Sequence, residues 1–167
     1  LTCYMQQPLL KQNIETEIKN SIKTKVDSCF QEMKSSFESK GMSVTINKKD
    51  FSVELFPRRI RTSINYGVVI TSSGATSNYN EIDVDLKSNL YDLVSIASSI
   101  ANWEARYGDA ETTIYMAYYP TIKVDKVKLD DGSKIYIITD RNTKEEFKFA
   151  SRSVVFPPGY GASEIKT

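Results

Sequence analysis

The chain has 167 residues, with 22 Lys and Arg against 21 Asp and Glu, and no His. This length is typical of one domain, and a chain of this size buries roughly 70% of its unfolded surface. The net charge of +1 provides no general attraction for nucleic acid, so we expect no nucleic-acid partner. Ten Tyr, seven Phe and one Trp favour a folded core over a disordered chain.

The absence of His excludes several kinds of site within this chain. His is the commonest metal ligand and the commonest general acid or base at neutral pH. Ser-His-Asp and Cys-His catalytic sites are therefore excluded, and two Cys cannot form a zinc site built from four thiolates. We expect no metal, no cofactor and no enzymatic activity. Any chemistry would have to use carboxylates, Lys, Tyr or Arg.

The two cysteines, Cys3 and Cys29, are expected to be unpaired thiols. A continuous helix from Leu9 to Cys29 would span about 30 Å. The segment 3–8 reaches at most about 20 Å when extended, so the two sulfur atoms would not meet. Cys29 is then expected to be a small core residue of the helix.

Residues 9–40 are predicted to form one long amphipathic helix. Pro8 suits its first turn and Gly41 its C-terminal cap. The apolar residues recur at steps of three or four, as a helix with one buried face requires; they are Leu10, Ile14, Ile18, Ile22, Val26, Phe30, Met33 and Phe37. This stripe either packs entirely on a sheet or leaves its first half, to Ile22, as an assembly surface.

An antiparallel meander is predicted after this helix, from alternating apolar and polar residues. Its strands are expected at 42–47, 51–56, 59–72 and 81–87. The segment 48–50 is interpreted as a turn, residues 72–78 as a polar hairpin loop, and Gly67 as a bulge. On the last strand we expect Ile82, Val84 and Leu86 to point inward.

A second, well-buried helix is predicted from Ser88 or Asn89 to Tyr107, with Ile96 and Trp103 widening its apolar stripe. Further strands are expected at 112–119, 122–129, 135–139 and 145–155. Turns are predicted at 130–133 and 140–143, the first because Asp130-Asp131-Gly132 is a strong hairpin signal.

These elements predict an α+β fold in the order meander, helix, meander, with a long N-terminal amphipathic helix and a second buried helix packed on antiparallel sheet. One domain is expected over 9–156, with a sub-division into 9–107 and 108–156 as an alternative. Residues 1–8 are interpreted as a juxtamembrane or leader remnant and 157–167 as an extended tail.

Carboxylates in two places are candidates for a site. Glu81, Asp83 and Asp85 share one face of a strand and could bind calcium or act as a carboxylate pair, but a solvated strand face is the preferred interpretation. Asp130 and Asp131 lack the ligand spacing of a calcium loop, so a hairpin turn is preferred there.

Two clusters are candidates for an interaction surface, one basic and one aromatic. The basic cluster could bind an anionic surface, or its charge could protect an edge strand from pairing. The aromatic cluster could form an interface, or it could be half-buried strand packing. The six residues are Arg58, Arg59, Arg61, Tyr115, Tyr118 and Tyr119.

Several loose motifs over residues 9–107 resemble a family of uncharacterised archaeal proteins from small-genome archaea. The motifs are Ile14-x3-Ile18, Val26-Asp27-Ser28-Cys29-Phe30, Lys40-Gly41, Leu90-Tyr91-Asp92-Leu93-Val94 and Asn102-Trp103-Glu104. Members of that family carry an N-terminal membrane helix and an extracytoplasmic domain. The resemblance implies a surface-anchored location, with an anchor preceding Leu1, and no catalytic residues. A long helix leading into antiparallel sheet is also similar in architecture to type IV pilins.

We therefore expect a non-enzymatic extracytoplasmic domain of a membrane-anchored archaeal surface protein, with a structural or protein-contact role. Protein partners or self-association would use the N-terminal helix, and membrane contact would come only through the upstream anchor. One alternative is a pilin-like subunit of a surface filament. Another is a glycan-active enzyme that uses Asp83 with Asp85.

Overall fold

The structure, a computed structural model, describes residues 9–152. In this range the chain forms three helices and nine strands, and all strand pairs are antiparallel. The predicted α+β fold with a long N-terminal helix is confirmed.

The chain divides into two compact units. Residues Gln12–Lys87 form the N-terminal unit, and the other described residues, 9–11 and 88–152, form what we call the C-terminal unit. The boundary between these units lies between Lys87 and Ser88, because the second helix packs on the C-terminal strands. The sub-division into 9–107 and 108–156 stays a prediction. The single domain over 9–156 stays a prediction.

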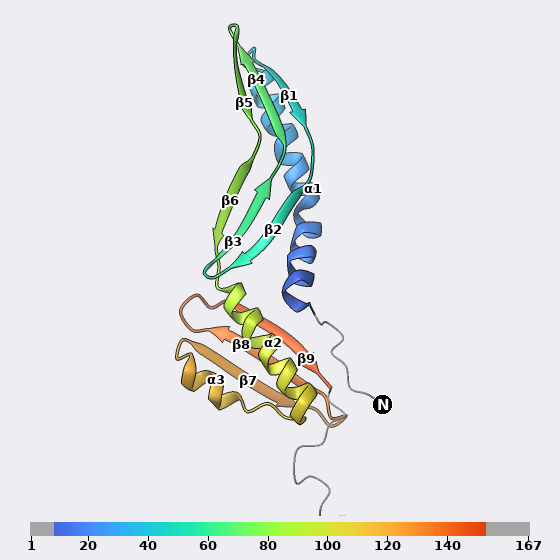
Figure 1. The fold of residues 1–167 in the computed structure, drawn as a ribbon, viewed down its shortest axis with the longest axis vertical. Coiled ribbons are helices and arrows are strands. Elements are labelled where there is room, and N and C mark those ends of the chain that lie inside the picture. Colours follow the sequence, from blue (N-terminus) through green and yellow to red (C-terminus); the bar gives the residue numbers. More distant parts are fainter. Residues whose placement is uncertain (1–8, 153–167) are drawn as a thin grey trace, which may run out of the picture. The chain divides into compact units, whose positions relative to one another are not determined.

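The N-terminal unit contains three long antiparallel runs, each interrupted once (Figure 1). One three-stranded sheet has the order β1-β4-β5 and the other the order β2-β3-β6. Together the runs 43–56, 59–72 and 75–87 follow the predicted meander. The strands are β1 (Ser43–Asn47), β2 (Phe51–Phe56), β3 (Arg59–Ile64), β4 (Gly67–Ser72), β5 (Ala75–Tyr79) and β6 (Ile82–Lys87).

The interruptions arise from mismatched numbers of residues. Residues 48–50 lie opposite 65–66, three against two, so the predicted turn at 48–50 is wrong and the segment is a break within one run. Residues 65–67 lie opposite only 80–81, which places an additional residue in the segment that contains Gly67. This is the arrangement expected of a bulge.

The predicted loop at 72–78 is largely a strand. Ser73 and Gly74 both have positive φ, 49° and 83°, and form the tight turn between β4 and β5. Every residue of β5 is exposed, so the pattern Ala75-Thr76-Ser77-Asn78 has no buried face to reveal it. Its polar composition is therefore also typical of a loop, which is why the sequence predicts one here.

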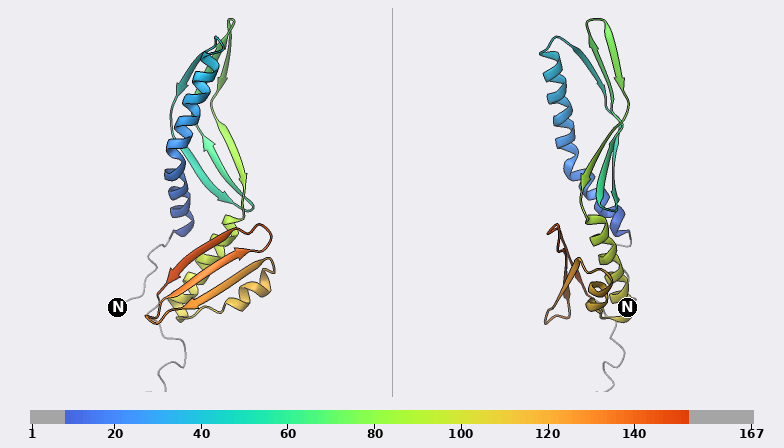
Figure 2. Two further views of the ribbon diagram at one scale, coloured as in Figure 1. Left: turned by 180° about the vertical axis from the view of Figure 1, so that it is seen from behind. Right: turned by 90° about the vertical axis from the view of Figure 1, so that its left-hand side faces the viewer.

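Helix α1 (Leu10–Glu38) lies along one face of the strands of the N-terminal unit (Figure 2). Its apolar stripe packs on the cluster that Phe30, only 6% exposed, forms with buried strand residues. Ile18 and Ile22 are part of this packing, so the sheet-packing interpretation holds for this portion of the stripe. The buried members are Phe30, Val44, Phe51, Val53, Ile64, Tyr66 and Val68.

Two expectations about burial in this unit are wrong. Cys29 is an exposed free thiol and not a core residue, because the stripe faces the sheet through its neighbour Phe30; Cys3 lies outside the described residues. Val84 and Leu86 are 52% and 63% exposed. They share the face of Val53, but β6 ends the sheet, and the residues packed beneath α1 come mainly from β1 to β4.

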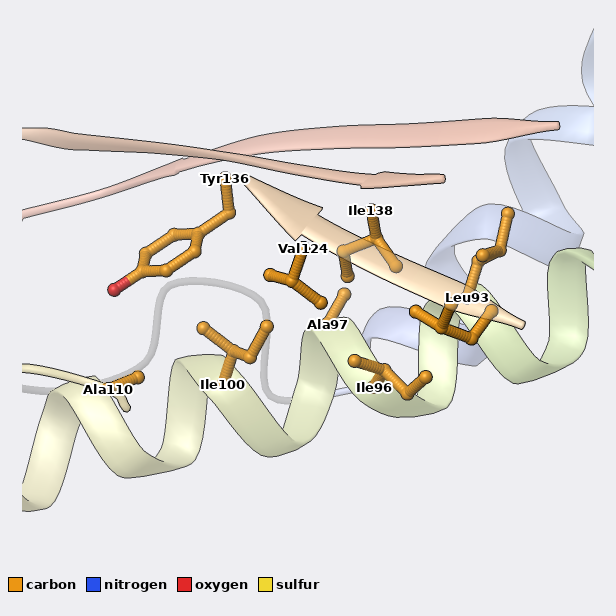
Figure 3. Close-up of a cluster of buried hydrophobic side chains, with 9 residues drawn as sticks. Leu93, Ile96, Ala97, Ile100, Ala110, Val124, Tyr136 and Ile138 are labelled. Carbon is orange, nitrogen blue, oxygen red and sulfur yellow. The ribbon is translucent and has the colours of Figure 1, made fainter. Parts of the chain in front are cut away.

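In the C-terminal unit two helices cover one face of the sheet β7-β8-β9. Leu93, Ala97 and Ile100 of the first helix pack against inward residues of β7 and β8 (Figure 3). The prediction that Trp103 adds to the buried stripe is wrong, because its side chain is 42% exposed. The elements are α2 (Leu90–Tyr107), α3 (Thr112–Tyr118), β7 (Ile122–Lys128), β8 (Lys134–Asp140) and β9 (Glu146–Ser151).

The strand predicted at 112–119 is wrong, because these residues form α3. The Glu111 side chain caps the helix by accepting hydrogen bonds from the Thr113 backbone N–H and hydroxyl, at 3.1 and 2.8 Å. Thr112, Tyr115 and Met116 are the half-buried positions, at the i, i+3, i+4 spacing of a helix. Capping and this spacing prevail over the β preference of the individual residues.

We predict that Phe30→Ala lowers the free energy of unfolding of the N-terminal unit by about 3–5 kcal/mol, because it leaves a cavity under α1. The matched control is Cys29→Ala, at the next position of the same helix, which should change it by less than about 0.5 kcal/mol. Hydrogen exchange of the β1 and β4 amides measures both. Equal effects of the two substitutions would contradict the packing of α1.

Candidate functional site

The basic cluster lies at the β2–β3 turn and along β3. Arg58 occupies the turn with a φ of 64°. Arg61 donates from Nε and Nη2 to the two carboxylate oxygens of Asp85, at 2.8 and 2.9 Å. Arg59 lies 3.8 Å from Asp85, and its guanidinium is 5.3 Å from the Phe56 ring centre. The Arg61 guanidinium is thus engaged within the sheet.

The edge-strand interpretation of the basic cluster is wrong, because β3 is the central strand of the order β2-β3-β6. The register places Arg61 between Glu54 and Asp85 on the face opposite α1. Opposite charges directly across neighbouring strands stabilise a sheet by a few tenths of a kcal/mol to about 1 kcal/mol. A cross-strand charge ladder is therefore what this cluster forms.

The strand carboxylates are part of the same ladder. Asp83 lies 3.9 Å from Arg61, and Glu81 lies in the break before β6. The hydrogen bonds from Arg61 hold the pKa of Asp85 below its usual range. A glycosidase needs one carboxyl group that keeps its proton near neutral pH, which requires a raised pKa. The pKa of Asp85 is lowered instead.

The aromatic cluster lies in the C-terminal unit, on α3 and at its C-terminal cap. The Tyr115 hydroxyl lies 2.9 Å from the Ser99 hydroxyl of α2, and its ring packs on the core. Tyr118 and Tyr119 are 79% and 54% exposed. The predicted interaction residues thus belong to different units, and only Tyr118 and Tyr119 of the aromatic group offer a large exposed surface.

An open hollow on the exposed side of α2 carries further aromatic surface. The rings of Trp103 and Tyr107 lie 4.7 Å apart, and the Arg106 guanidinium is 6.0 Å from the Tyr107 ring centre. Ser, Asn and Ala side chains form the rest of the lining. The lining comes from a single helix, so the hollow is open and not an enclosed site.

The most buried charged cluster of the C-terminal unit was not predicted from the sequence. Glu104, only 1% exposed, accepts hydrogen bonds from the Tyr136 hydroxyl, the Ala110 backbone N–H at 2.8 Å and Lys134 Nζ at 2.8 Å. Lys134 also donates to the Gly108 carbonyl. Figure 3 shows the Tyr136 hydroxyl at the Ala110 end of the core cluster.

Asp109 extends this cluster toward the surface. Its carboxylate lies 2.9 Å from Lys126 Nζ, 3.0 Å from Lys128 Nζ and 3.1 Å from Lys134 Nζ. Burial alone would raise its pKa, but hydrogen bonds from the three lysines outweigh burial and hold the pKa well below its usual range. Burial and the neighbouring Glu104 raise the pKa of Tyr136, so the phenol stays protonated and donates.

This cluster closes the C-terminal end of α2. Gly108 takes the left-handed conformation that ends the helix, with φ at 80°, and Lys134 and Glu104 then hold the following loop through Gly108 and Ala110. The sequence contained a signal for it: the stripe Leu93, Ala97, Ile100 continues at the next helical step to Glu104. A carboxylate in an apolar stripe needs a buried partner.

Carboxylates of the β8–β9 turn hold the N-terminal end of α2. Glu145 accepts from the Ser88 hydroxyl at 2.6 Å and the Asn89 backbone N–H at 2.8 Å. Asp140 accepts from the Asn89 side chain at 2.7 Å and from two N–H groups of its own turn. Negative charge at a helix N-terminus is stabilising, so both carboxylates have a structural role here.

The Asp130–Ser133 segment forms the predicted turn between β7 and β8. Asp131 accepts from the Ser133 backbone N–H and hydroxyl, at 2.9 and 3.0 Å, and Gly132 has a φ of 81°. Within residues 9–152 there is no group of three or more Cys, Asp or Glu placed to hold a metal ion. Over the same range, no helix is long and apolar enough to cross a membrane.

Comparison with known protein families, curated proteins and solved structures finds no match to this chain.

We predict that Lys134→Met lowers the free energy of unfolding of the C-terminal unit by about 3–5 kcal/mol, because it leaves the buried Glu104 carboxylate without its counter-ion. The matched control, Lys123→Met, removes an exposed pair with Asp125 and should cost less than about 1 kcal/mol. Fluorescence of Trp103, the single Trp, follows unfolding of this unit. Similar losses for both variants would contradict the role of the buried pair.

The Asp109 carboxylate should make stability dependent on pH. Its pKa is lower in the folded state than in the unfolded chain, where it is near 3.9. Its stabilising contribution is therefore complete above about pH 5 and is lost as the pH falls below about 4. In urea unfolding followed by Trp103 fluorescence, Asp109→Asn should be less stable than wild type at pH 7, with a gap that narrows toward pH 2. A constant gap would contradict this assignment.

Proposed function

We propose that this chain is a structural, protein-contacting domain without catalytic activity, belonging to a membrane-anchored extracytoplasmic protein. The location rests on the family resemblance of residues 9–107. The contact role rests on one observation of the fold: β6 has a neighbouring strand on one side only in the described part of the chain, and it exposes Val84 and Leu86.

The engagement of the strand carboxylates supports a structural role over a catalytic one. Asp85 is held ionised by Arg61, and Asp83 lies within the same charge ladder. A glycan-active enzyme built on this pair would need one of the two to act as a proton donor.

The two outer edges of the β2-β3-β6 sheet differ in a way that favours β6 as the contact strand. At the β2 edge, Glu15 of α1 accepts a hydrogen bond from the Leu55 backbone N–H at 2.7 Å. A side chain of the helix therefore already occupies a backbone donor of that edge. The opposite edge belongs to β6. An exposed strand edge is a template for addition of a strand from another chain.

The chemistry of β6 specifies the strand that would add to it. Asp83 and Asp85 point to one face and Val84 and Leu86 to the other. Arg61 lies beside Asp85 on the β3 side, so a basic residue on the other side would extend the alternation of charge. The proposed partner is a protein segment in which Lys or Arg alternates with Val, Ile or Leu.

A pair of synthetic strands tests this proposal. An eight-residue peptide of alternating Val and Lys should shift the backbone NMR signals of β5 and β6 in wild type, and a Val–Glu peptide of equal length should not. Leu86→Asp should weaken the Val–Lys effect at least about tenfold, because it places a charge on the apolar face. The control Asp130→Lys, in the β7–β8 turn, should leave it unchanged.

The proposal fails if neither peptide shifts β6 at millimolar concentration. It also fails if both peptides bind equally well, because charge complementarity would then have no part in recognition.

A further inference from the structure

We infer that the chain forms a weak homodimer through the face of the β7-β8-β9 sheet opposite α2 and α3, with a two-fold axis parallel to β8. We call this the outer face. It goes beyond the proposed partner of β6, since it lies on other strands and its occupant is a second copy of the chain.

The outer face consists of three rows of side chains, each running across β7, β8 and β9 in register. The rows follow from the strand pairing and from the alternation of side chains along a strand. They are Val127, Ile135 and Ala150; Asp125, Ile137 and Lys148; and Lys123, Thr139 and Glu146.

The middle of the outer face is apolar and its flanks are charged. Ile135 and Ile137 on β8 are half-buried, and Val127 on β7 is 48% exposed. The inward residues of the same strands already form the core with α2, so these apolar side chains belong to no core of their own unit. A sheet face with an apolar centre and a polar rim has the anatomy of a protein interface.

The flanking charges are arranged so that the face complements itself. On β7, Lys123 and Asp125 pair at 2.7 Å, and on β9, Lys148 and Glu146 pair at 2.9 Å. Across the sheet, therefore, each row that contains a charge on β7 contains the opposite charge on β9. Lys123 on β7 shares its row with Glu146 on β9, and Asp125 on β7 shares its row with Lys148 on β9.

Only one of the two simple symmetric packings pairs opposite charges and also places the apolar row over the apolar row of the second copy. A two-fold axis parallel to β8 places β7 of one copy over β9 of the other without changing the rows. Asp125 then faces Lys148 of the second copy, and Lys123 faces Glu146 of the second copy. An in-plane axis perpendicular to the strands cannot pair all three rows. Through the Asp125 row it places Asp125 over its own copy, which is repulsive, and between the two charged rows it pairs the charges but leaves the Val127 row without a facing row. The parallel axis also matches the aligned packing of sheets, within about 30°.

The size of the outer face sets the strength of the dimer. Three strands spaced about 4.8 Å apart, with three outward residues each, cover roughly 300 Å² per copy. Stable complexes bury about 800 Å² per partner. We therefore expect a dissociation constant in the range of about 0.1–1 mM, measured as a concentration-dependent mass.

Charge reversal provides the test. Sedimentation equilibrium of the full chain under reducing conditions should show an average mass rising above 18.9 kDa toward twice that value as the concentration approaches about 1 mM. Asp125→Lys and Lys148→Glu should each weaken self-association at least about tenfold, because each creates two repulsive contacts across the axis. An equimolar mixture of the two variants should associate again, because both cross-axis pairs are then attractive.

Two controls keep this result interpretable. Asp130→Lys, a charge reversal of the same kind in the β7–β8 turn, should associate like wild type. Circular dichroism and the thermal midpoint of both charge variants should match wild type, because the pairs they alter are exposed.

Three results would overturn the inference: a monomer throughout the concentration range, a dimer unaffected by either reversal, or a mixture that fails to associate. None of these depends on β6, so the peptide experiment on that strand remains a separate test of the proposed function.

Discussion

A three-stranded antiparallel sheet needs a cover for at least one apolar face to be stable in water, and this constraint explains most of the architecture. In the N-terminal unit α1 provides the cover, with Phe30 at the buried centre of its stripe. In the C-terminal unit α2 provides it, assisted by the short α3. Each unit is therefore one layer of helix on one layer of sheet, and among the described residues of that unit no helix lies on the second face of the sheet.

Uncovered surface is where the chain can interact, and its chemistry differs between the two units. On the face of β2, β3 and β6 opposite α1, the surface is a charge ladder centred on Arg61. Its charges pair with one another through Asp83 and Asp85. Behind β7, β8 and β9 the surface has an apolar centre with Ile135 and Ile137. The exposed edge of the N-terminal unit, with Val84 and Leu86, adds a third kind of surface.

Electrostatics has a different role inside the C-terminal unit. The carboxylates of Glu145 and Glu104 hold opposite ends of α2, the first through N–H and hydroxyl donors and the second through Lys134 and Tyr136. Burying a charge is unfavourable unless it is paired and hydrogen-bonded. These contacts therefore specify where α2 begins and ends on the sheet. Both carboxylates form hydrogen bonds that hold the fold together.

The parts of the fold that could be predicted are those with one buried face. The stripe of α1 and the alternation in β2, β3 and β8 gave correct elements, because burial imposes a period on the sequence. The strand β5 could not be found, since it is exposed on both faces. The β preference of Thr, Ile and Tyr predicts a strand where α3 lies, and the cap at Glu111 that starts the helix is a separate signal outside that composition.

The candidate site was predicted only in its residue types. The sequence singles out Arg59, Arg61, Asp83 and Asp85 as charged strand residues. Their pairing depends on the register of β3 with β6, which no local pattern determines. Glu104 was not predicted as a site residue, although it continues the apolar stripe of α2. A carboxylate at a core position was the signal for the buried cluster.

The helices leave surfaces of the sheets open to contact, and within residues 9–152 the edge of β6 that faces away from β3 has no neighbouring strand. Amide hydrogen exchange resolved by NMR on the full chain tests it most directly. The account predicts alternation along residues 82–87: amides that point toward β3 exchange slowly, and those that point away exchange orders of magnitude faster. Uniform protection of all six amides would mean that another segment already covers this edge, and it would contradict the account.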